Sequence, residues 1–188
     1  MRNPSRRRIP SLFFLTDPKR TPDPAGVMAR LPAGSAVIYR AFGSKDAEAQ
    51  GRRLRQLARA RRLVFLVGAD AALARRLCAD GVHLPERLMR LAPRLRQAHP
   101  TWLITTAAHG PRAVAAAARL KLDAALVSAV FASASPSAGK PLGPLRFEIV
   151  ARRARLPVIA LGGIDAGTSR RLAHSRAAGL AAIGGLGG

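Results

Sequence analysis

The run Leu63-Val64-Phe65-Leu66-Val67 is the part of the sequence that says most about the fold. It is continuously apolar, whereas a strand with one face in water alternates apolar and polar residues. Strands that are apolar on both faces are typical of a parallel sheet covered by helices on both sides. The segment before this run, 46–62, places apolar residues on one helical face, and the segment after it, 71–79, is also expected to be helical. The three segments together predict a helix–strand–helix unit.

The same alternation of strands and helices extends through the whole chain. Eight strands separated by helices predict parallel pairing through crossovers, and eight such units predict a (β/α)₈ TIM barrel. An open doubly wound sheet is the alternative, but no Gly-x-Gly-x-x-Gly motif follows the first strand to mark a dinucleotide site. The expected strands are 12–16, 36–39, 63–67, 81–84, 101–105, 124–127, 158–161 and 180–183, and the expected helices are 46–62, 71–79, 85–98, 111–120, 145–155 and 168–174.

The length of 188 residues is short for this fold, which usually needs about 200–250 residues. We expect a basic N-terminal tail over residues 1–10 and one compact barrel domain over residues 11–188. Little sequence follows the last expected strand, so we expect the eighth helix to be missing or supplied by a neighbouring molecule.

The net charge of +22 raises the question of a nucleic-acid partner. Of the 32 basic residues 28 are Arg, and many lie on expected helices as solvated faces. Aromatic residues make up only 4% of the chain, so it lacks the stacking surface that proteins use for single strands. We therefore expect no nucleic-acid partner, but a basic surface that attracts anionic ligands.

The cysteine content and the apolar runs exclude further classes of protein. A single cysteine, Cys78, cannot form a disulfide framework or a cysteine-based metal site. No apolar run approaches the roughly 20 residues of a membrane span, so we expect no membrane association. These features predict a cytoplasmic protein.

Small and polar residues after several expected strands suggest phosphate binding, because the ligand sites of a barrel follow the carboxyl ends of its strands. Gly162-Gly163 follows the seventh strand and Gly184 the eighth, and glycine lets backbone amides approach an anion. Plain tight turns are the alternative. In the loop 133–143, the hydroxyls of Ser133 and Ser135 and the ammonium of Lys140 could hold a phosphate or diphosphate. A disordered loop of small residues is the alternative.

Two histidines lie at or near the ends of strands. His109 follows the fifth strand and precedes a helix, which is where a general acid or base would be placed. His83 lies within the fourth strand and could point into the barrel or into its outer layer. No group of His, Asp and Glu has the spacing of metal ligands, so we predict no metal site.

Five segments together resemble the thiamine phosphate synthase and thiazole tautomerase family. They occur in the family's order over nearly the whole chain, and the third and fifth are the most specific. The family has a (β/α)₈ barrel, so the resemblance implies the fold that the periodicity predicts. The segments are Phe14-Leu15-Thr16-Asp17, Val37-Ile38-Tyr39-Arg40, Ala79-Asp80-Gly81-Val82-His83-Leu84, 126–131 and Leu156-Pro157-Val158-Ile159-Ala160-Leu161-Gly162-Gly163-Ile164.

The resemblance implies ligands and site residues. Synthases of this family join hydroxymethylpyrimidine diphosphate to thiazole phosphate, and Mg²⁺ assists the departure of diphosphate. Arg40 matches the family's arginine after the second strand, and Gly162, Gly163 and Gly184 match its thiazole phosphate loops. The sequence departs from the family elsewhere: Phe42 and Pro136 replace lysines, Gly68-Ala69 replaces Asn-Asp, and an aspartate is missing near Leu88.

These departures fall on the residues that would handle diphosphate and Mg²⁺. The tautomerase branch needs no metal, and His109 matches the position of its acid/base histidine. The leading expectation is therefore a cofactor-free proton transfer on thiazole carboxylate phosphate. A divergent synthase that uses Mg²⁺ and a non-catalytic protein that binds a phosphorylated ligand are the alternatives, and Asp70 or Glu86 could form a shifted metal site. The expected partners are a phosphorylated thiazole or pyrimidine and, in a homodimer, a second copy of the chain.

Overall fold

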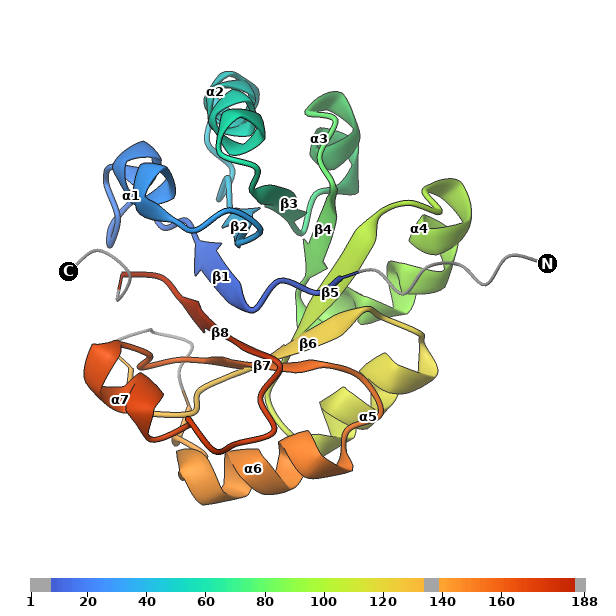
Figure 1. Cartoon of the computed structure of the whole chain (residues 1–188). Helices are drawn as coiled ribbons and strands as arrows, with labels where there is room; N and C mark the ends of the chain where they lie inside the picture. The colour runs from blue at the N-terminus through green and yellow to red at the C-terminus, as the bar shows by residue number, and fades with distance from the viewer. Residues whose placement is uncertain (1–7, 134–138, 185–188) are drawn as a thin grey trace.

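The computed structural model describes residues 8–133 and 139–184. Its centre is a closed barrel of eight parallel strands in chain order, with helices around the outside (Figure 1). The expected (β/α)₈ barrel is thus confirmed. The strands are β1 (Leu12–Leu15), β2 (Ala36–Tyr39), β3 (Val64–Gly68), β4 (Gly81–Leu84), β5 (Leu103–Ala108), β6 (Ala124–Val127), β7 (Val158–Leu161) and β8 (Gly179–Ala182).

The first and last strands close the barrel. Phe13 of β1 lies opposite Ala36 of β2 on one side and Ala181 of β8 on the other. Closure leaves no unpaired sheet edge, so each of the eight strands is paired with a neighbouring strand on both sides.

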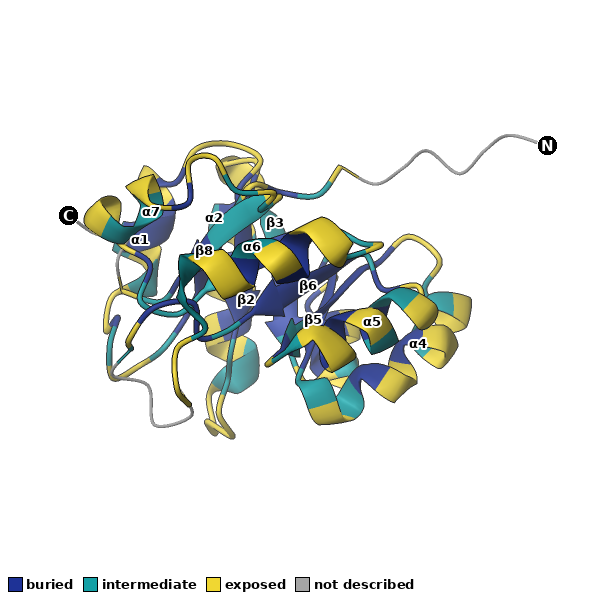
Figure 2. Cartoon of the chain, turned by 90° about the horizontal axis from the view of Figure 1, so that it is seen from below, coloured by how far each residue is buried: buried dark blue, intermediate teal, exposed yellow. Residues whose placement is uncertain are grey.

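Successive residues of each strand point alternately into the barrel and out toward the helices. Leu66 belongs to the apolar cluster inside the barrel, whereas Phe65 and Val67 on either side of it belong to the cluster between strands and helices. All three side chains are buried. Burial of both faces explains why 63–67 is apolar throughout, and Figure 2 shows the same pattern of buried strands beneath helices that are exposed on their outer side.

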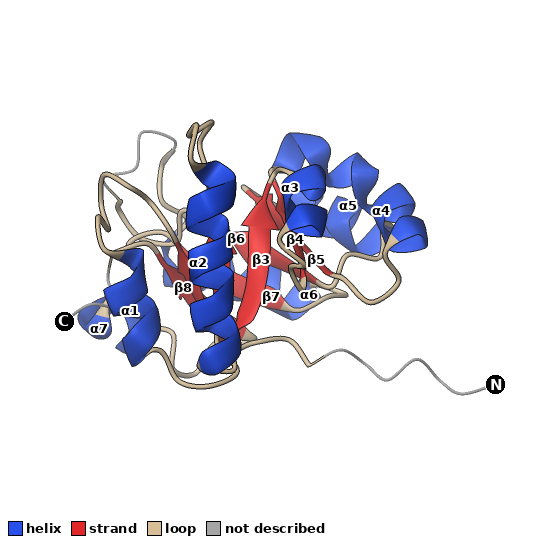
Figure 3. Cartoon of the chain, turned by 90° about the horizontal axis from the view of Figure 1, so that it is seen from above, coloured by secondary structure: helices blue, strands red, loops and turns tan. Residues whose placement is uncertain are grey.

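The helices follow the strands closely, and α2 lies along the outside of β3 (Figure 3). Most expected helices are present with boundaries shifted by a few residues. Within 85–98, the first part is a 3₁₀ helix (Glu86–Leu91) and only the second part is α-helical. The α-helices are α1 (Pro24–Arg30), α2 (Ala47–Ala60), α3 (Ala71–Arg76), α4 (Ala92–Ala98), α5 (Pro111–Arg119), α6 (Gly143–Arg153) and α7 (Ala166–Arg170).

The sequence reasoning did not predict α1. This helix has only seven residues, too few for a clear periodic pattern, but its start carries a signal. Asp23 caps it by accepting a hydrogen bond from the Gly26 amide at 2.9 Å, and Pro24 occupies the first turn. After β8, residues 183 and 184 form no helix. Residues 1–7 of the predicted tail lie outside the described part of the chain. No helix within 8–133 or 139–184 is long and apolar enough to cross a membrane.

Two aspartates anchor strands at the amino-terminal end of the barrel. Asp80, just before β4, accepts a hydrogen bond from the Phe65 amide at 2.8 Å and two from Arg55 of α2, both at 2.9 Å. Asp123, just before β6, accepts from the Ile104 amide at 2.7 Å and pairs with Arg96 of α4. Each carboxylate ties the start of one strand to the helix that packs near it, at the face of a barrel that serves stability rather than chemistry.

We expect Asp80→Asn to destabilise the protein by about 1–2 kcal/mol, because the amide keeps an acceptor for Phe65 but removes the charged partner of the largely buried Arg55. Urea denaturation measures this change. Asp46→Asn is the matched control, because Asp46 is exposed and makes no capping hydrogen bond. Equal stability of the two variants would show that the Asp80 contacts contribute nothing.

Candidate functional site

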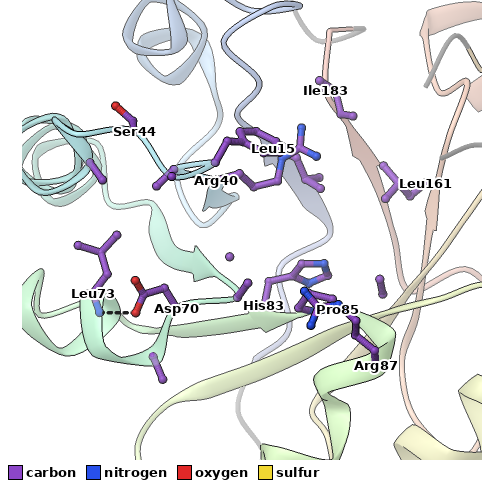
Figure 4. A pocket seen from close by; sticks show the side chains of 18 of the residues that line it. Leu15, Arg40, Ser44, Asp70, Leu73, His83, Pro85, Arg87, Leu161 and Ile183 are labelled. Atoms are coloured by element: carbon purple, nitrogen blue, oxygen red, sulfur yellow. Dashed lines mark hydrogen bonds between the residues drawn. The ribbon is translucent and has the colours of Figure 1, made fainter. Parts of the chain in front are cut away.

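A pocket of about 1240 Å³ opens at the carboxyl-terminal end of the barrel. Its floor is a ring to which each strand contributes one inward-facing residue at or next to its carboxyl end, several of them labelled in Figure 4. This is the face on which barrels carry their ligand sites. The ring consists of Leu15, Arg40, Gly68, His83, Ala107, Ser128, Leu161 and Ile183.

Charge is distributed unevenly around this pocket. Every Lys, Arg, Asp and Glu in its lining belongs to residues 40–87, which run from the end of β2 through β3 and β4 to the start of the 3₁₀ helix. The segments around β6, β7 and β8 contribute only uncharged residues. We call the first side the basic half, with Arg40, Lys45, Arg76, Arg87, Glu48 and Asp70, and the second the neutral half, with Ser128, Ala129, Ser133, Leu161, Gly162 and Ile183.

Arg40 lies in the basic half, directly after β2. Its Nε donates to the Thr16 carbonyl at 2.7 Å, and its Nη2 lies 3.2 Å from Asp17 Oδ2. Its guanidinium also lies over the ring of Phe42, 4.9 Å from the centroid. Desolvation by burial lowers the pKa of Arg40, partly offset by the charge of Asp17. The guanidinium is therefore held in one place and poorly hydrated, which strengthens its attraction for an anion in the pocket.

Gly68, at the end of β3, makes room for this arginine. A Cβ atom at this position would lie 3.1 Å from Cγ of Arg40. Glycine here is thus explained by close packing beside the site.

His83 points into the barrel at the floor of the pocket, which settles the orientation that the sequence left open. Its side chain is buried, and its Nδ1 lies 3.0 Å from Oγ1 of Thr105 on β5. Burial, together with the smaller effect of the positive charge of Arg40, lowers the pKa of His83 to about 4. The imidazole is therefore neutral at physiological pH, and its Nε2 has no hydrogen-bond partner among the described residues.

His109 follows β5, as expected, and lines the mouth of the pocket. Its Nδ1 lies 2.7 Å from Glu86 Oε2, and its backbone amide donates to the same oxygen at 2.9 Å. The side chain is about half exposed. A carboxylate that holds one ring nitrogen orients the other nitrogen for proton transfer, so this pair can act as an acid/base unit.

Gly162 and Gly163 form a tight turn directly after β7. Both residues have a positive φ, 94° for Gly162 and 64° for Gly163. A Cβ atom on Gly163 would lie 2.3 Å from the Ala132 carbonyl oxygen, so packing against the loop after β6 requires glycine here. No described residue accepts a hydrogen bond from the amide of Gly162 or Gly163.

The other predicted phosphate ligands are less closely associated with the pocket. Ser133 and Gly162 line it, whereas Gly163, Gly184 and the exposed Lys140 do not belong to its lining. Ser135 lies outside the described residues. Their roles as ligands stay predictions.

Sequence reasoning gave no site role to several polar residues of this pocket, among them Lys45, Arg87 and His83, whose orientation it left open. For His83 a signal was present: Val82 and Leu84 are apolar and flank it, so strand alternation places His83 on the opposite, inward face. Lys45 and Arg87 follow β2 and β4 in exposed segments, where nothing in the sequence separates them from other solvated cations.

The carboxylates of the pocket do not fit a Mg²⁺ site. Asp70 accepts a hydrogen bond from the Leu73 amide at 2.8 Å and caps α3 (Figure 4). Glu48 is paired with both Arg52 and Arg76, and these hydrogen bonds lower its pKa. Glu86 is paired with His109. Within the described parts of the chain, no three His, Cys, Asp or Glu residues are grouped to hold a metal ion.

The depressed pKa of His83 makes folding stability depend on pH. The unfolded chain binds a proton at this residue near pH 6.5, whereas the folded protein does so only near pH 4. Stability is therefore fully present above pH 6.5 and falls as the pH is lowered through this window, by up to about 3 kcal/mol from this residue. Urea denaturation at several pH values should show a shallower fall for His83→Gln than for the unchanged protein. Parallel curves would contradict the assignment.

A family model and the curated relatives indicate the same family for this chain. Residues 12–186 match the family model described as thiamine monophosphate synthase. The chain is 34% identical over 167 residues to the thiamine-phosphate synthase of Chromobacterium violaceum, covering 84% of this chain and 78% of that one. It is 30% identical over 187 residues to the thiamine-phosphate synthase of Alcanivorax borkumensis, covering 94% and 84%.

A solved structure has the same fold. The thiamine phosphate pyrophosphorylase from Pyrococcus furiosus superimposes with a TM-score of 0.81 at 23% identity, covering 95% of this chain and 88% of that one. The family model extends from β1 to the residues after β8 and so includes both halves of the pocket. The chain belongs to the thiamine monophosphate synthase family.

Proposed function

We propose that this protein joins a pyrimidine diphosphate to a thiazole phosphate, the reaction after which its relatives are named. The observation that supports this most directly is the division of the pocket into a basic half and a neutral half. Two phosphorylated substrates need two anion sites on either side of the forming bond. This favours the synthase, which was the alternative from sequence, over the tautomerase.

The basic half suits the substrate whose diphosphate leaves. Negative charge builds up on the leaving oxygens during the reaction, and fixed cations next to them lower the barrier. Arg40 is held in place by Thr16 and Asp17, so it needs little reorganisation when that charge appears. Arg87 lies near Pro85 and His83 at the same pocket (Figure 4).

The neutral half suits the phosphate of the thiazole, which does not react. Gly162 lies in this half, and amides without protein partners can bind phosphate oxygens as uncharged donors. Ser128 and Ser133 line the same half. Binding of this type fixes the position of the thiazole ring without drawing charge away from the basic half.

The bond exchange needs no proton transfer at the reacting atoms. The lone pair of the thiazole nitrogen forms the new C–N bond to the methylene carbon of the pyrimidine. The C–O bond to diphosphate breaks, and its electron pair leaves with the diphosphate. The positive charge remains on the thiazolium ring of thiamine phosphate. The neutral His83 at the pocket floor suits this chemistry, because it can hydrogen-bond a ring substituent without adding a charge.

Incubation of the protein with hydroxymethylpyrimidine diphosphate and thiazole phosphate should yield thiamine phosphate and diphosphate. We expect Arg40→Gln to lower kcat/KM by about 10- to 100-fold, because it removes a desolvated cation at the leaving group. Arg53→Gln, at an exposed position of α2 outside the pocket, is the control and should leave the rate unchanged. No product under any condition, with thiazole phosphate still bound in calorimetry, would favour a non-catalytic binding protein.

A second candidate function is the tautomerase-like proton transfer on thiazole carboxylate phosphate. The specific observation in its favour is the pair of His109 and Glu86 at the mouth of the pocket. This reaction would need His109 to shuttle a proton, whereas the synthase reaction would not.

Isomerisation of thiazole carboxylate phosphate, followed by NMR, tests this candidate. We expect His109→Gln to reduce any such activity at least about 100-fold, in keeping with the loss of a general acid/base. His174→Gln is the matched control, because His174 is exposed and lies outside the pocket. Thiamine phosphate formation should survive His109→Gln, so the two activities are separable by one substitution.

A further inference from the structure

The pocket combines cations that lack protein partners with carboxylates that are already engaged. Lys45 and Arg87 both line it and are exposed, and neither makes an ion pair with any residue in 8–133 or 139–184. Its acidic residues, by contrast, are engaged in pairing and helix capping: Glu48 contacts Arg52 and Arg76, and Asp70 caps α3. The groups available to a ligand are therefore positive.

Proteins that hold a diphosphate through Mg²⁺ need carboxylate oxygens for the metal, in addition to the phosphate oxygens of the ligand. A pocket that binds the same group directly needs guanidinium and ammonium donors, which pair with phosphate oxygens without a metal. The basic half corresponds to the second arrangement. Arg40 and Lys45 after β2 and Arg87 in the 3₁₀ helix after β4 supply three cations.

We propose that Arg40, Lys45 and Arg87 bind the diphosphate group of the substrate directly, so that its binding needs no divalent cation. The identity of the substrate in this inference rests on the proposed function. The binding of a diphosphate group by these three residues does not. Inorganic diphosphate carries the same charged group and is a sufficient probe.

The main experiment is calorimetric titration of the whole protein with inorganic diphosphate, once in excess EDTA and once in excess Mg²⁺. We expect binding in EDTA, with a dissociation constant no more than about threefold weaker than in Mg²⁺, because the protein groups that contact the ligand are the same. Binding that occurs only with Mg²⁺ would overturn the proposal. So would the absence of binding in both conditions by a protein that folds normally.

Substitutions identify the groups that bind. Arg87→Gln and Lys45→Gln should each weaken binding in EDTA by about 5- to 10-fold, since each removes one charge-assisted contact at an exposed rim. Arg90→Gln is the matched control for Arg87→Gln, because Arg90 lies in the same 3₁₀ helix, is exposed and does not line the pocket. An equal effect of Arg87→Gln and Arg90→Gln would mean that only the overall charge matters and would overturn the site.

The Asp70→Asn variant distinguishes direct binding of diphosphate from binding through a metal ion held by Asp70. Asn is as good a helix cap as Asp, so α3 should stay intact while the carboxylate is lost. Direct binding predicts unchanged or tighter binding of diphosphate, because one negative charge leaves the pocket. A loss of Mg²⁺-supported binding in this variant would show that Asp70 holds a metal and would contradict the proposal.

The outcomes for the reaction and for the binding are distinguishable. Diphosphate binding in EDTA without formation of thiamine phosphate would support direct binding and refute the proposed reaction. Thiamine phosphate formation with diphosphate binding only in Mg²⁺ would support the reaction and refute direct binding.

Discussion

The hydrogen bonds between β1 and β8 are the constraint on which the rest of the structure depends. Once Phe13 lies between Ala36 and Ala181, the sheet has no edge, and each strand is enclosed by the barrel interior on one side and by helices on the other. The strands are therefore apolar on both faces, apart from the buried His83, Thr105 and Thr106. Closure also brings eight carboxyl ends, far apart in the sequence, into one ring around a single pocket. The site is thus a consequence of closure rather than of any one motif.

This constraint explains why the fold could be predicted from the sequence. The run 63–67 is apolar on both faces because Phe65 packs on helices and Leu66 fills the barrel, and such runs recur at regular spacing. The exact boundaries of the helices and strands, and the short helix α1, were harder to predict from the sequence. A helix of seven residues that buries only Val27 and Met28 leaves almost no periodic trace, so its capping residues Asp23 and Pro24 are the only local signal.

Pocket residues were predictable where a polar residue directly follows a strand, as Arg40 and His109 do, or where the backbone shape requires glycine. A positive φ and close packing restrict both Gly162 and Gly163 to glycine, and of the two Gly162 lines the pocket. The pairing of His109 with Glu86 joins the loops after two neighbouring strands, and no local pattern specifies it. Lys45 and Arg87 could not be identified from the sequence. In a chain with 28 arginines, the sequence does not distinguish a cation at the mouth of the pocket from a solvated cation elsewhere on the surface.

The small number of acidic residues in the chain bears on how the pocket binds its ligand. The chain has only ten Asp and Glu residues, and six of them pair with Arg or His: Asp17, Glu48, Asp80, Glu86, Asp123 and Glu148. Three others, Asp23, Asp70 and Asp165, cap helices. The fold therefore uses nearly all its carboxylates to stabilise helices and strands, which leaves few to hold a metal ion. In the basic half of the pocket, Lys45 and Arg87 make no ion pair within the described residues, and such positive charge repels free divalent cations and attracts polyanions, so it favours direct binding of a diphosphate.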